Sequence, residues 1–167
     1  GGIPIIHAMQ SEFYADDLTR VMGIMNGTTN FMLCKMEDEG ASYNTVLKEA
    51  QDLGFAEADP TADVEGFDVQ AKISILAKLC YGKTVDPSTV PTKGISSITD
   101  IDFEYAKIMK STIKLLGCAQ TNPDGSLAVF VSPMMVPLTS TLASAKGPGN
   151  MVAVSSENMG ASTFAGP

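Results

Sequence analysis

The chain has 167 residues, of which 44% are hydrophobic and 18% are charged, so it is long enough for one globular domain and too short for two of ordinary size. Its net charge of −8 argues against nucleic-acid binding, because phosphate recognition needs clustered Lys and Arg, and the eleven such residues here are scattered. No apolar run reaches the roughly 18 residues of a membrane-spanning helix. The composition therefore predicts a soluble domain with no nucleic-acid or membrane partner.

Three cysteines, Cys34, Cys80 and Cys118, lie far apart and form no C-x-x-C pair. This pattern is typical of reduced thiols in a reducing compartment, so we expect neither a disulfide framework nor a zinc site. The chain opens at Gly1 without a methionine and stops at Pro167 in a glycine-bearing stretch. We therefore expect 1–167 to be one domain of a longer protein, truncated at both ends.

Helix signals dominate the first two thirds of the chain. Polar residues that can cap a helix and glycines that can end one divide this part into four expected helices. The first begins at Thr28 or Thr29, after the turn signal Asn26-Gly27, and stops at Gly40; the second runs from a Ser42 cap to Gly54; the third covers Phe67 to Tyr81; and the fourth runs from Asp100 or Asp102 to Leu116.

Strand signals fill the last third of the chain. An Asn-Pro-Asp-Gly turn at 122–125 precedes an apolar run at 127–131, and further apolar runs cover 134–138 and 151–154. One more run of strand length lies at 20–25. Helices followed by strands predict an α+β fold, with helices packed on one face of a mainly antiparallel or mixed β-sheet. The edge or face of such a sheet could pair two subunits.

An acidic loop from Phe55 to Gly66, together with the helix start beyond it, carries the candidate binding residues. Five acids there repel one another unless they face water or bind a positive group: Glu57, Asp59, Asp63, Glu65 and Asp68. A solvated loop, a calcium site and a site for the ammonium group of an amino acid are all open. The spacing lacks the alternating ligands and central glycine of an EF-hand, which disfavours calcium.

Lys72 lies one helical turn after Asp68. At about 100° per residue, both residues share a stripe with Ile75 and Leu79, and we expect this stripe to belong to the buried face of the helix. Burial lowers the pKa of a lysine and a neighbouring carboxylate raises it, so the balance can leave an ammonium group usable in acid–base chemistry. Lys72 is therefore a candidate catalytic residue, with an ordinary ion pair as the alternative.

Two blocks of the chain resemble one enzyme family. The segment 23–32, GIMNGTTNFM, resembles the G-I-x-N-G-T-T-N-F/Y block of homoserine dehydrogenases. The segment 54–72, GFAEADPTADVEGFDVQAK, resembles that family's longer pattern G-[YF]-A-E-x-D-P-x-x-D-x-x-G-x-D-x-x-x-K. The opening GGIPII is similar to the start of the family's catalytic domain, so the resemblance covers nearly the whole chain.

The resemblance implies the substrate-binding and dimerisation domain of an enzyme that interconverts L-aspartate 4-semialdehyde and L-homoserine with NADP or NAD. This reaction belongs to the biosynthesis of threonine, methionine and isoleucine. Lys72 would be the catalytic acid/base and Asp68 its catalytic partner, with Asp68 also binding substrate. The further substrate ligands would be Glu57, Asp63, Gly27 and Thr28, and Gly27 would also approach the nicotinamide of the cofactor.

The family also binds a monovalent cation, Na⁺ or K⁺, largely through backbone carbonyls, and Gly1 and Ile3 match two of these positions. A glutamate ligand lies upstream of this chain in the family. No G-x-G-x-x-G motif follows a strand, so the NAD(P)-binding Rossmann domain is absent from 1–167. We therefore expect the fragment alone to be inactive.

A non-catalytic acidic module that binds a cationic ligand, calcium or a protein partner is the alternative function, and the joint presence of Lys72 with its acids disfavours it. The resemblance implies a homodimer, allows fusion to an aspartate kinase, and implies a cytoplasmic or, in a photosynthetic eukaryote, plastid location. His7, the only histidine, is expected to be a packed or surface imidazole. Met25, beside the Asn-Gly turn, is a candidate for the pocket lining.

Overall fold

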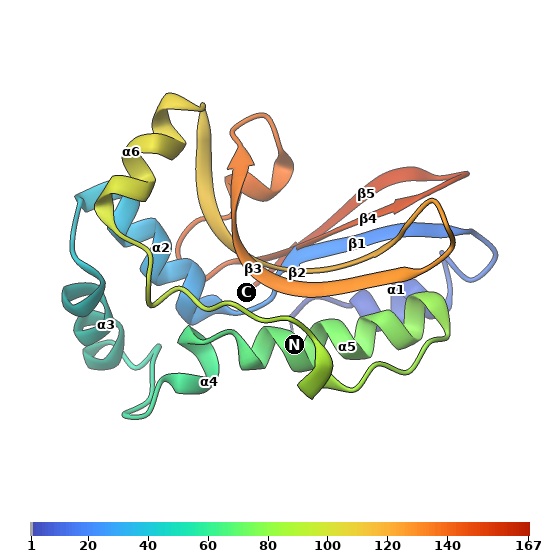
Figure 1. Ribbon diagram of the computed structural model, residues 1–167, viewed down its shortest axis with the longest axis horizontal. Helices are drawn as coiled ribbons and strands as arrows, with labels where there is room; N and C mark the ends of the chain where they lie inside the picture. Colours follow the sequence, from blue (N-terminus) through green and yellow to red (C-terminus); the bar gives the residue numbers. More distant parts are fainter. Residues whose placement is uncertain (1) are drawn as a thin grey trace.

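The computed structural model describes residues 2–167 (Figure 1). Within this range, the chain forms helices and the strands of a single sheet. The helices are α1 (Ile5–Gln10), α2 (Gly27–Glu39), α3 (Tyr43–Asp52), α4 (Thr61–Val64), α5 (Phe67–Tyr81) and α6 (Asp100–Ile108), with short 3-10 helices η1 (Pro87–Thr89) and η2 (Thr141–Ser144). The strands are β1 (Leu18–Ile24), β2 (Ser111–Thr121), β3 (Leu127–Pro137), β4 (Asn150–Ser156) and β5 (Gly160–Gly166).

The strands form a sheet in the order β3-β2-β1-β4-β5, and every neighbouring pair is antiparallel. Strand β1 is the central strand. Its residue Met22 lies opposite Cys118 of β2 on one side and Ala153 of β4 on the other. The turn predicted at 122–125 joins β2 to β3. The predicted α+β class with an antiparallel sheet is confirmed.

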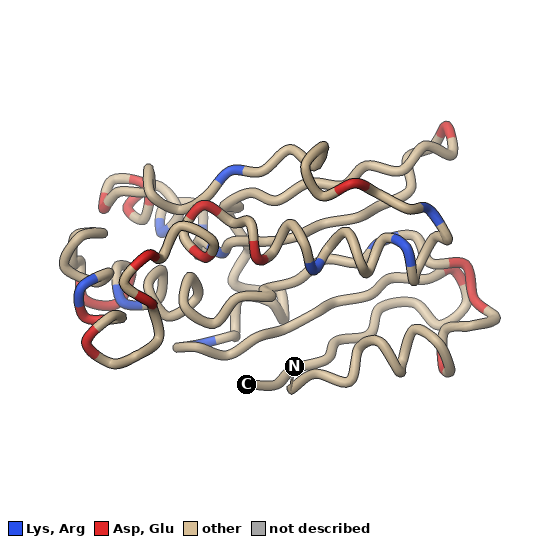
Figure 2. Tube along the Cα trace, turned by 90° about the horizontal axis from the view of Figure 1, so that it is seen from below, with Lys and Arg blue, Asp and Glu red and all other residues tan. Residues whose placement is uncertain are grey.

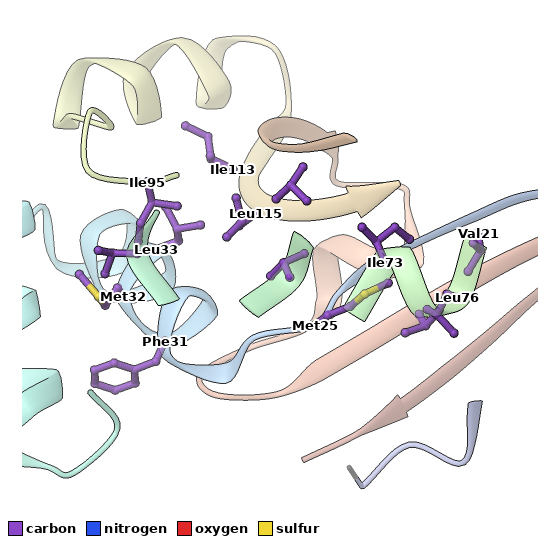
Figure 3. Packing of buried hydrophobic residues seen from close by; sticks show 14 of the residues in the cluster. Val21, Met25, Phe31, Met32, Leu33, Ile73, Leu76, Ile95, Ile113 and Leu115 are labelled. Atoms are coloured by element: carbon purple, nitrogen blue, oxygen red, sulfur yellow. The ribbon is translucent and has the colours of Figure 1, made fainter. Parts of the chain in front are cut away.

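The main core lies between the sheet and its helices. Ile113 and Leu115, which alternate along β2, belong to the same buried cluster as Leu33 of α2 and Ile73 of α5. Figure 3 shows this packing, with Leu115 between the α2 and α5 parts of the cluster. Burying this many aliphatic side chains supplies most of the driving force for folding, at about 25 cal/mol per Å² of apolar area.

The opposite face of the sheet carries a smaller apolar cluster. Ile24, Leu116 and Val136 pack there against Leu142 and Ala145, which belong to the segment around η2. The large helices therefore cover one face, as predicted, and the η2 segment covers part of the other.

The predicted fourth helix is wrong beyond residue 108. Helix α6 ends at Ile108, Lys110 takes a φ of 51°, and β2 begins at Ser111. Pairing with β3 along the whole of β2 overrides the local helix signal. Gly117 ends no helix: it lies inside β2, where a Cβ atom would come within 2.9 Å of Val69 Cγ1, so a glycine lets α5 pack closely on the sheet.

Other predicted elements differ less. Helix α5 and the Ser42 cap of α3 match the prediction, whereas Asn26-Gly27 is no turn: Asn26 caps α2, which begins at Gly27. The acidic segment predicted as a loop contains α4, and the strand runs predicted at 127–131 and 134–138 form one strand, β3. Helix α1 and strand β5 have no counterpart among the predicted elements.

The Lys and Arg residues are scattered in the structure, as they are in the sequence. Figure 2 shows the Lys and Arg positions spread over the molecule rather than gathered on one face. Within residues 2–167, no helix is long and apolar enough to cross a membrane. All three cysteines are free thiols, as expected.

Candidate active site

The corner between α4 and α5 brings two acids together. Gly66 caps α5 with a φ of 83°, a left-handed conformation that favours glycine, and its N–H donates to the carbonyl of Asp63. Because of this sharp turn, Asp63 of α4 lies next to Asp68, which is in the first turn of α5. A carboxylate in that position interacts favourably with the N-terminal end of the helix dipole.

Asn26 joins these two acids to the end of β1. Its Oδ1 accepts a hydrogen bond from the N–H of Thr29 at 2.9 Å, which caps α2. Its Nδ2 donates to Asp63 Oδ1 at 2.7 Å and to Asp68 Oδ2 at 2.9 Å. Because Asn26 is buried and every polar atom of its side chain is used, it fixes the positions of both carboxylates.

Lys72 completes the group. Its Nζ lies 2.7 Å from Asp68 Oδ2, as an ion pair, and donates to the carbonyl of Met25 at 2.9 Å. The Lys72 side chain is 50% exposed and that of Asp68 31%, so the pair lies at the surface of the site rather than inside the core. An ammonium group has three N–H donors, and two are used here, so the third is free for a ligand.

The expected burial of the Lys72 stripe is wrong. Ile75, which shares this stripe, is 54% exposed, whereas the buried face of α5 is formed by Val69, Ile73 and Leu76. The stripe lies beside the buried face because it faces a cavity rather than the sheet. Both Lys72 and Ile75 line this cavity.

The cavity has a volume of about 220 Å³ and a largely apolar wall. It lies among α1, α5 and the adjoining ends of β1 and β4, and Met25 lines it, as predicted. Its lining consists of Gly2, Ile3, Ile5, Ile6, Ile24, Met25, Lys72, Ile75, Leu76, Asn150, Val152 and Pro167. Figures 1 and 2 both place the two chain ends close together, and Gly2 and Pro167 both line this cavity.

Gly27 and Thr28 have clear structural roles. A Cβ atom on Gly27 would lie 2.8 Å from the carbonyl oxygen of Pro148, so glycine lets the loop before β4 close over the start of α2. The hydroxyl of Thr28 donates to the carbonyl of Phe55 at 2.6 Å and ties α2 to the acidic segment. Contacts of these residues with substrate or cofactor stay predictions.

The acidic segment itself divides into different environments. Glu57 is exposed, and its carbonyl accepts a hydrogen bond from Gln51 Nε2 at 3.1 Å, which holds the backbone while the carboxylate faces solvent. Asp59 instead accepts hydrogen bonds from the hydroxyl and N–H of Thr61, and these hold the pKa of Asp59 below its usual value. The structure therefore joins Asp63, but not Glu57 or Asp59, to the Lys72 group.

Two of the three remaining predicted residues, Ile3 and His7, fall within the described residues. Gly1 falls outside the described residues, and Ile3 lines the cavity, where its carbonyl stays a predicted cation ligand. His7 is exposed on α1, as a surface imidazole would be.

Sequence reasoning missed two polar residues of the site, Asn26 and Asn150. The Asn26-Gly27 pair predicts a turn, although a polar residue before an apolar helix is also a capping signal. Its bonds to Asp63 and Asp68 join positions 37 and 42 residues away, and no local pattern predicts them. Asn150 gives no local signal, because only the strand pairing places it at the cavity.

Comparison with known proteins identifies a family for this chain. A family model described as homoserine dehydrogenase matches residues 4–167. Homoserine dehydrogenase of Bacillus subtilis is 48% identical over 168 residues, covering 100% of this chain and 38% of that protein, and the Lactococcus lactis enzyme is 39% identical, covering 99% and 39%. The chain thus spans about two fifths of these relatives.

Solved structures give the same result. A homoserine dehydrogenase from Thiobacillus denitrificans superposes with a TM-score of 0.96 at 40% identity, covering 99% of this chain and 38% of that one. A hyperthermophilic archaeal homoserine dehydrogenase mutant in complex with NADPH gives 0.81 at 25% identity, covering 98% and 46%. The α+β domain with its lysine–carboxylate site is thus a domain of an oxidoreductase family. The chain belongs to the homoserine dehydrogenase family.

Proposed function

We propose that the full-length protein containing this chain interconverts L-aspartate 4-semialdehyde and L-homoserine with NADP or NAD, and that 1–167 is its substrate-binding domain. Membership of the family supports the reaction. The observation that carries the assignment to these residues is the half-exposed Lys72 ammonium, held by Asp68 and the Met25 carbonyl at the rim of an apolar cavity. The Rossmann domain would lie in the rest of the protein, and the fragment alone would be inactive.

Lys72 acts as the acid and base at the reacting oxygen. When the aldehyde is reduced, its oxygen gains negative charge, and the third N–H of Lys72 stabilises this charge and then supplies the proton. In the reverse direction Lys72 accepts the proton of the hydroxyl group. Asp68 keeps the ammonium group in place through its 2.7 Å ion pair, so the proton donor is oriented before substrate arrives.

The acids bind the charged end of the substrate. Asp63 lies next to Asp68, and both carboxylates retain acceptor capacity beyond the bonds from Asn26 and Lys72. Together with Glu57 they favour a cation, which suits the α-ammonium group of an amino acid. Gly27 and Thr28, which follow Asn26 at the start of α2, are the other proposed substrate ligands.

The cavity beside Lys72 fits the nicotinamide end of the cofactor. Its wall is apolar, as the face of a heteroaromatic ring requires, and Met25, Ile75 and Val152 would hold the ring. The cofactor, when bound, exchanges a hydride with the substrate carbon. The NADPH in the archaeal relative supports a nicotinamide cofactor. Gly27 would approach the same ring.

A monovalent cation and a second subunit complete the proposal. The carbonyls of Gly1 and Ile3 would contribute to a Na⁺ or K⁺ site. The sheet face opposite the large helices would pair with a second copy, because it has a groove of about 410 Å³ whose lining includes Met22, Met134, Leu142 and the exposed Met135. The mass of the full-length protein in solution, measured by light scattering, tests the dimer.

The activity is tested with the complete reading frame. We expect NAD(P)H absorbance to fall only when aspartate semialdehyde is added, and NAD(P)⁺ to be reduced with L-homoserine. A folded protein that turns over neither substrate with either cofactor would contradict the proposal. Calcium binding by such a protein, measured by calorimetry, would support the acidic module instead.

A further inference from the structure

Helix α4 carries Asp63, one of the proposed substrate ligands, and is only one turn long. It covers Thr61–Val64, and Asn26 bonds the carboxylate of Asp63. A single helical turn is not stable by itself, because fixing its backbone costs more free energy than its few hydrogen bonds return. The position of Asp63 therefore depends on the parts of the fold that hold the backbone of α4 from outside.

The segment 90–95, which follows η1, is hydrogen-bonded to β3, an outer strand of the sheet. The N–H of Val131 in β3 donates to the carbonyl of Pro91, and the N–H of Lys93 donates to the carbonyl of Val131, both at 2.9 Å. The first and last residues of the segment are both buried in the main core. The segment is thus fixed to the sheet and can hold a neighbouring element in place.

The same segment is bonded to α4. The N–H of Ile95 donates to the carbonyl of Val64, the residue next to Asp63, at 2.8 Å. A Cβ atom on Gly94 would overlap this carbonyl and the backbone of Glu65, so a glycine lets the segment approach α4 this closely. The backbone beside Asp63 is therefore held by a bond from a segment that is itself fixed to the sheet.

Gln70 joins the segment to α5. Its Nε2 donates to the carbonyl of Val90 at 3.1 Å and to Thr92 Oγ1 at 2.8 Å. At about 100° per residue, Gln70 lies about 160° around the helix from Lys72, so its side chain points away from the proposed acid/base. The segment 90–95 thus connects α4 with α5 and fixes their relative positions.

We propose that the segment 90–95 is a positioning element for substrate binding, because it fixes the distance between Asp63 and Lys72. Gly94 and Gln70 are its positioning residues. This inference rests on the proposed function, in which Asp63 binds the substrate ammonium and Lys72 acts at the reacting oxygen. The spacing of the two side chains must then match the length of the substrate between these groups.

Loosening α4 should affect binding and chemistry differently. Asp68 and Lys72 both belong to α5 and are paired across one helical turn, so their contact does not depend on α4. Asp63 is the residue that should shift. The expected signature is a raised KM with an unchanged kcat. A purely structural defect instead lowers the amount of folded enzyme, which reduces the apparent kcat and leaves KM unchanged.

The experiment measures the steady-state kinetics of the full-length protein with aspartate semialdehyde. Gln70→Met removes both donated hydrogen bonds and keeps a long side chain, while the carbonyl of Val90 still accepts a hydrogen bond from Thr92 Oγ1 at 2.9 Å. We expect KM to rise about threefold to tenfold, as for one weakened hydrogen bond, and kcat to change by less than about twofold. Gly94→Ala should raise KM further, because its Cβ forces the segment away from α4.

Tyr81→Phe is the matched control. It removes one hydrogen bond of α5, from the Tyr81 hydroxyl to the carbonyl of Ala119 at 3.0 Å, at the end of the helix away from α4. It should change neither KM nor kcat. If Gly94→Ala does not fold, as judged by circular dichroism, Gln70→Met carries the test. An unchanged KM in the folded Gln70→Met enzyme, or an equal rise in Tyr81→Phe, would overturn the inference.

A second measurement separates this inference from the proposed function. Amide hydrogen exchange of residues 61–66, followed by mass spectrometry, reports how firmly α4 is held and needs no turnover. Exchange should be faster in Gln70→Met than in Tyr81→Phe. This difference, in a protein that does not turn over aspartate semialdehyde, would contradict the proposed reaction and still support the anchoring of α4. Equal exchange in the two variants would overturn the anchoring, even in an active enzyme.

Discussion

Asn26 and Lys72 donate hydrogen bonds to the same oxygen atom, Oδ2 of Asp68, at 2.9 Å and 2.7 Å. Asn26 comes from the end of β1 and Lys72 from α5, so the shared oxygen aligns the helix with the sheet. The second bond of Asn26, to Asp63, extends the alignment to α4. One buried amide thus sets the relative positions of the proposed acid/base and two proposed substrate ligands.

Replacement of Lys72 by Ala tests the acid/base role. We expect kcat to fall by about two orders of magnitude or more, because general acid–base catalysis contributes about 10²–10⁴-fold. The side chain is half exposed, so the free energy of unfolding should change little. Steady-state kinetics and urea unfolding measure the two quantities.

Lys78, exposed on the same helix, provides the matched control. Lys78→Ala removes the same charge from α5 and should leave kcat unchanged. Near-normal turnover by the Lys72→Ala enzyme would refute the role of Lys72.

Replacement of Asn26 by Asp tests the shared hydrogen bonds. Aspartate still caps α2, but it removes both N–H donors and adds a third carboxyl group beside Asp63 and Asp68. We expect kcat/KM to fall at least about tenfold, because the charges repel and the carboxylates lose their fixed positions.

The same variant has a characteristic pH dependence. Repulsion raises the pKa of the introduced carboxyl group in the folded protein above its unfolded value, so stability is lost as pH rises through the folded pKa. The destabilisation relative to the unmodified protein should therefore be larger at pH 8 than at pH 5, as measured by urea unfolding at both values. Equal destabilisation at the two pH values would argue against a cluster of carboxylates.

The sequence predicts helices well where their ends carry local signals. Helix α5 has a glycine at each end, and both Gly66 and Gly82 take positive φ values, so its bounds follow from neighbouring residues alone. The apolar side chains of Ile113, Leu115 and Leu116 suit either structure, and pairing with β3 makes this segment a strand. The site divides in the same way: Lys72 and Asp68 are one turn apart on a helix, whereas Asn26 reaches them only through the fold.

Replacement of Glu57 by Ala tests the least constrained of the proposed substrate ligands. The carboxylate is exposed, so its removal should leave the melting temperature unchanged. We expect KM for aspartate semialdehyde to rise about tenfold with a smaller change in kcat, since Glu57 would bind the ammonium group rather than the reacting oxygen. Glu104→Ala, an exposed acid on α6, is the control, and an unchanged KM in Glu57→Ala would exclude the ligand role.

Replacement of Gly27 by Ala separates packing from ligand binding. The added Cβ would lie 2.8 Å from the carbonyl oxygen of Pro148, so the backbone of that loop must move. We expect a loss of about 1–3 kcal/mol in the free energy of unfolding, as for other overpacked positions. Gly125→Ala, at a glycine with open space around it, controls for added bulk but brings strain from its φ of 79°. A Gly27→Ala protein of normal stability with a raised KM would show that Gly27 contributes to substrate binding and not to packing.

The thiols of Cys118, which is buried, and Cys80, which is partly buried, should be unreactive in the folded protein. Burial raises the pKa of Cys80 from 9.0 to about 12 and that of Cys118 from 9.0 to about 11. Since only the thiolate reacts, the reactive fraction at pH 8 is smaller than that of a free cysteine by about a hundredfold to a thousandfold. Mass spectrometry after brief alkylation at pH 8 should find both unmodified, and modified once the protein is denatured.

Alkaline stability follows from the same shifts. A thiol whose folded pKa is raised stabilises the protein fully below its unfolded pKa, and the contribution is lost as pH rises from about 9 toward 12. Cys80→Ala and Cys118→Ala should therefore flatten the decline in the free energy of unfolding between pH 9 and pH 10.5, when each is compared with its own value at pH 8. The slope should change for these variants and stay the same for Ser155→Ala, which removes no titrating group. An identical slope in all three would mean that the thiols ionise as easily in the folded chain as in the unfolded one.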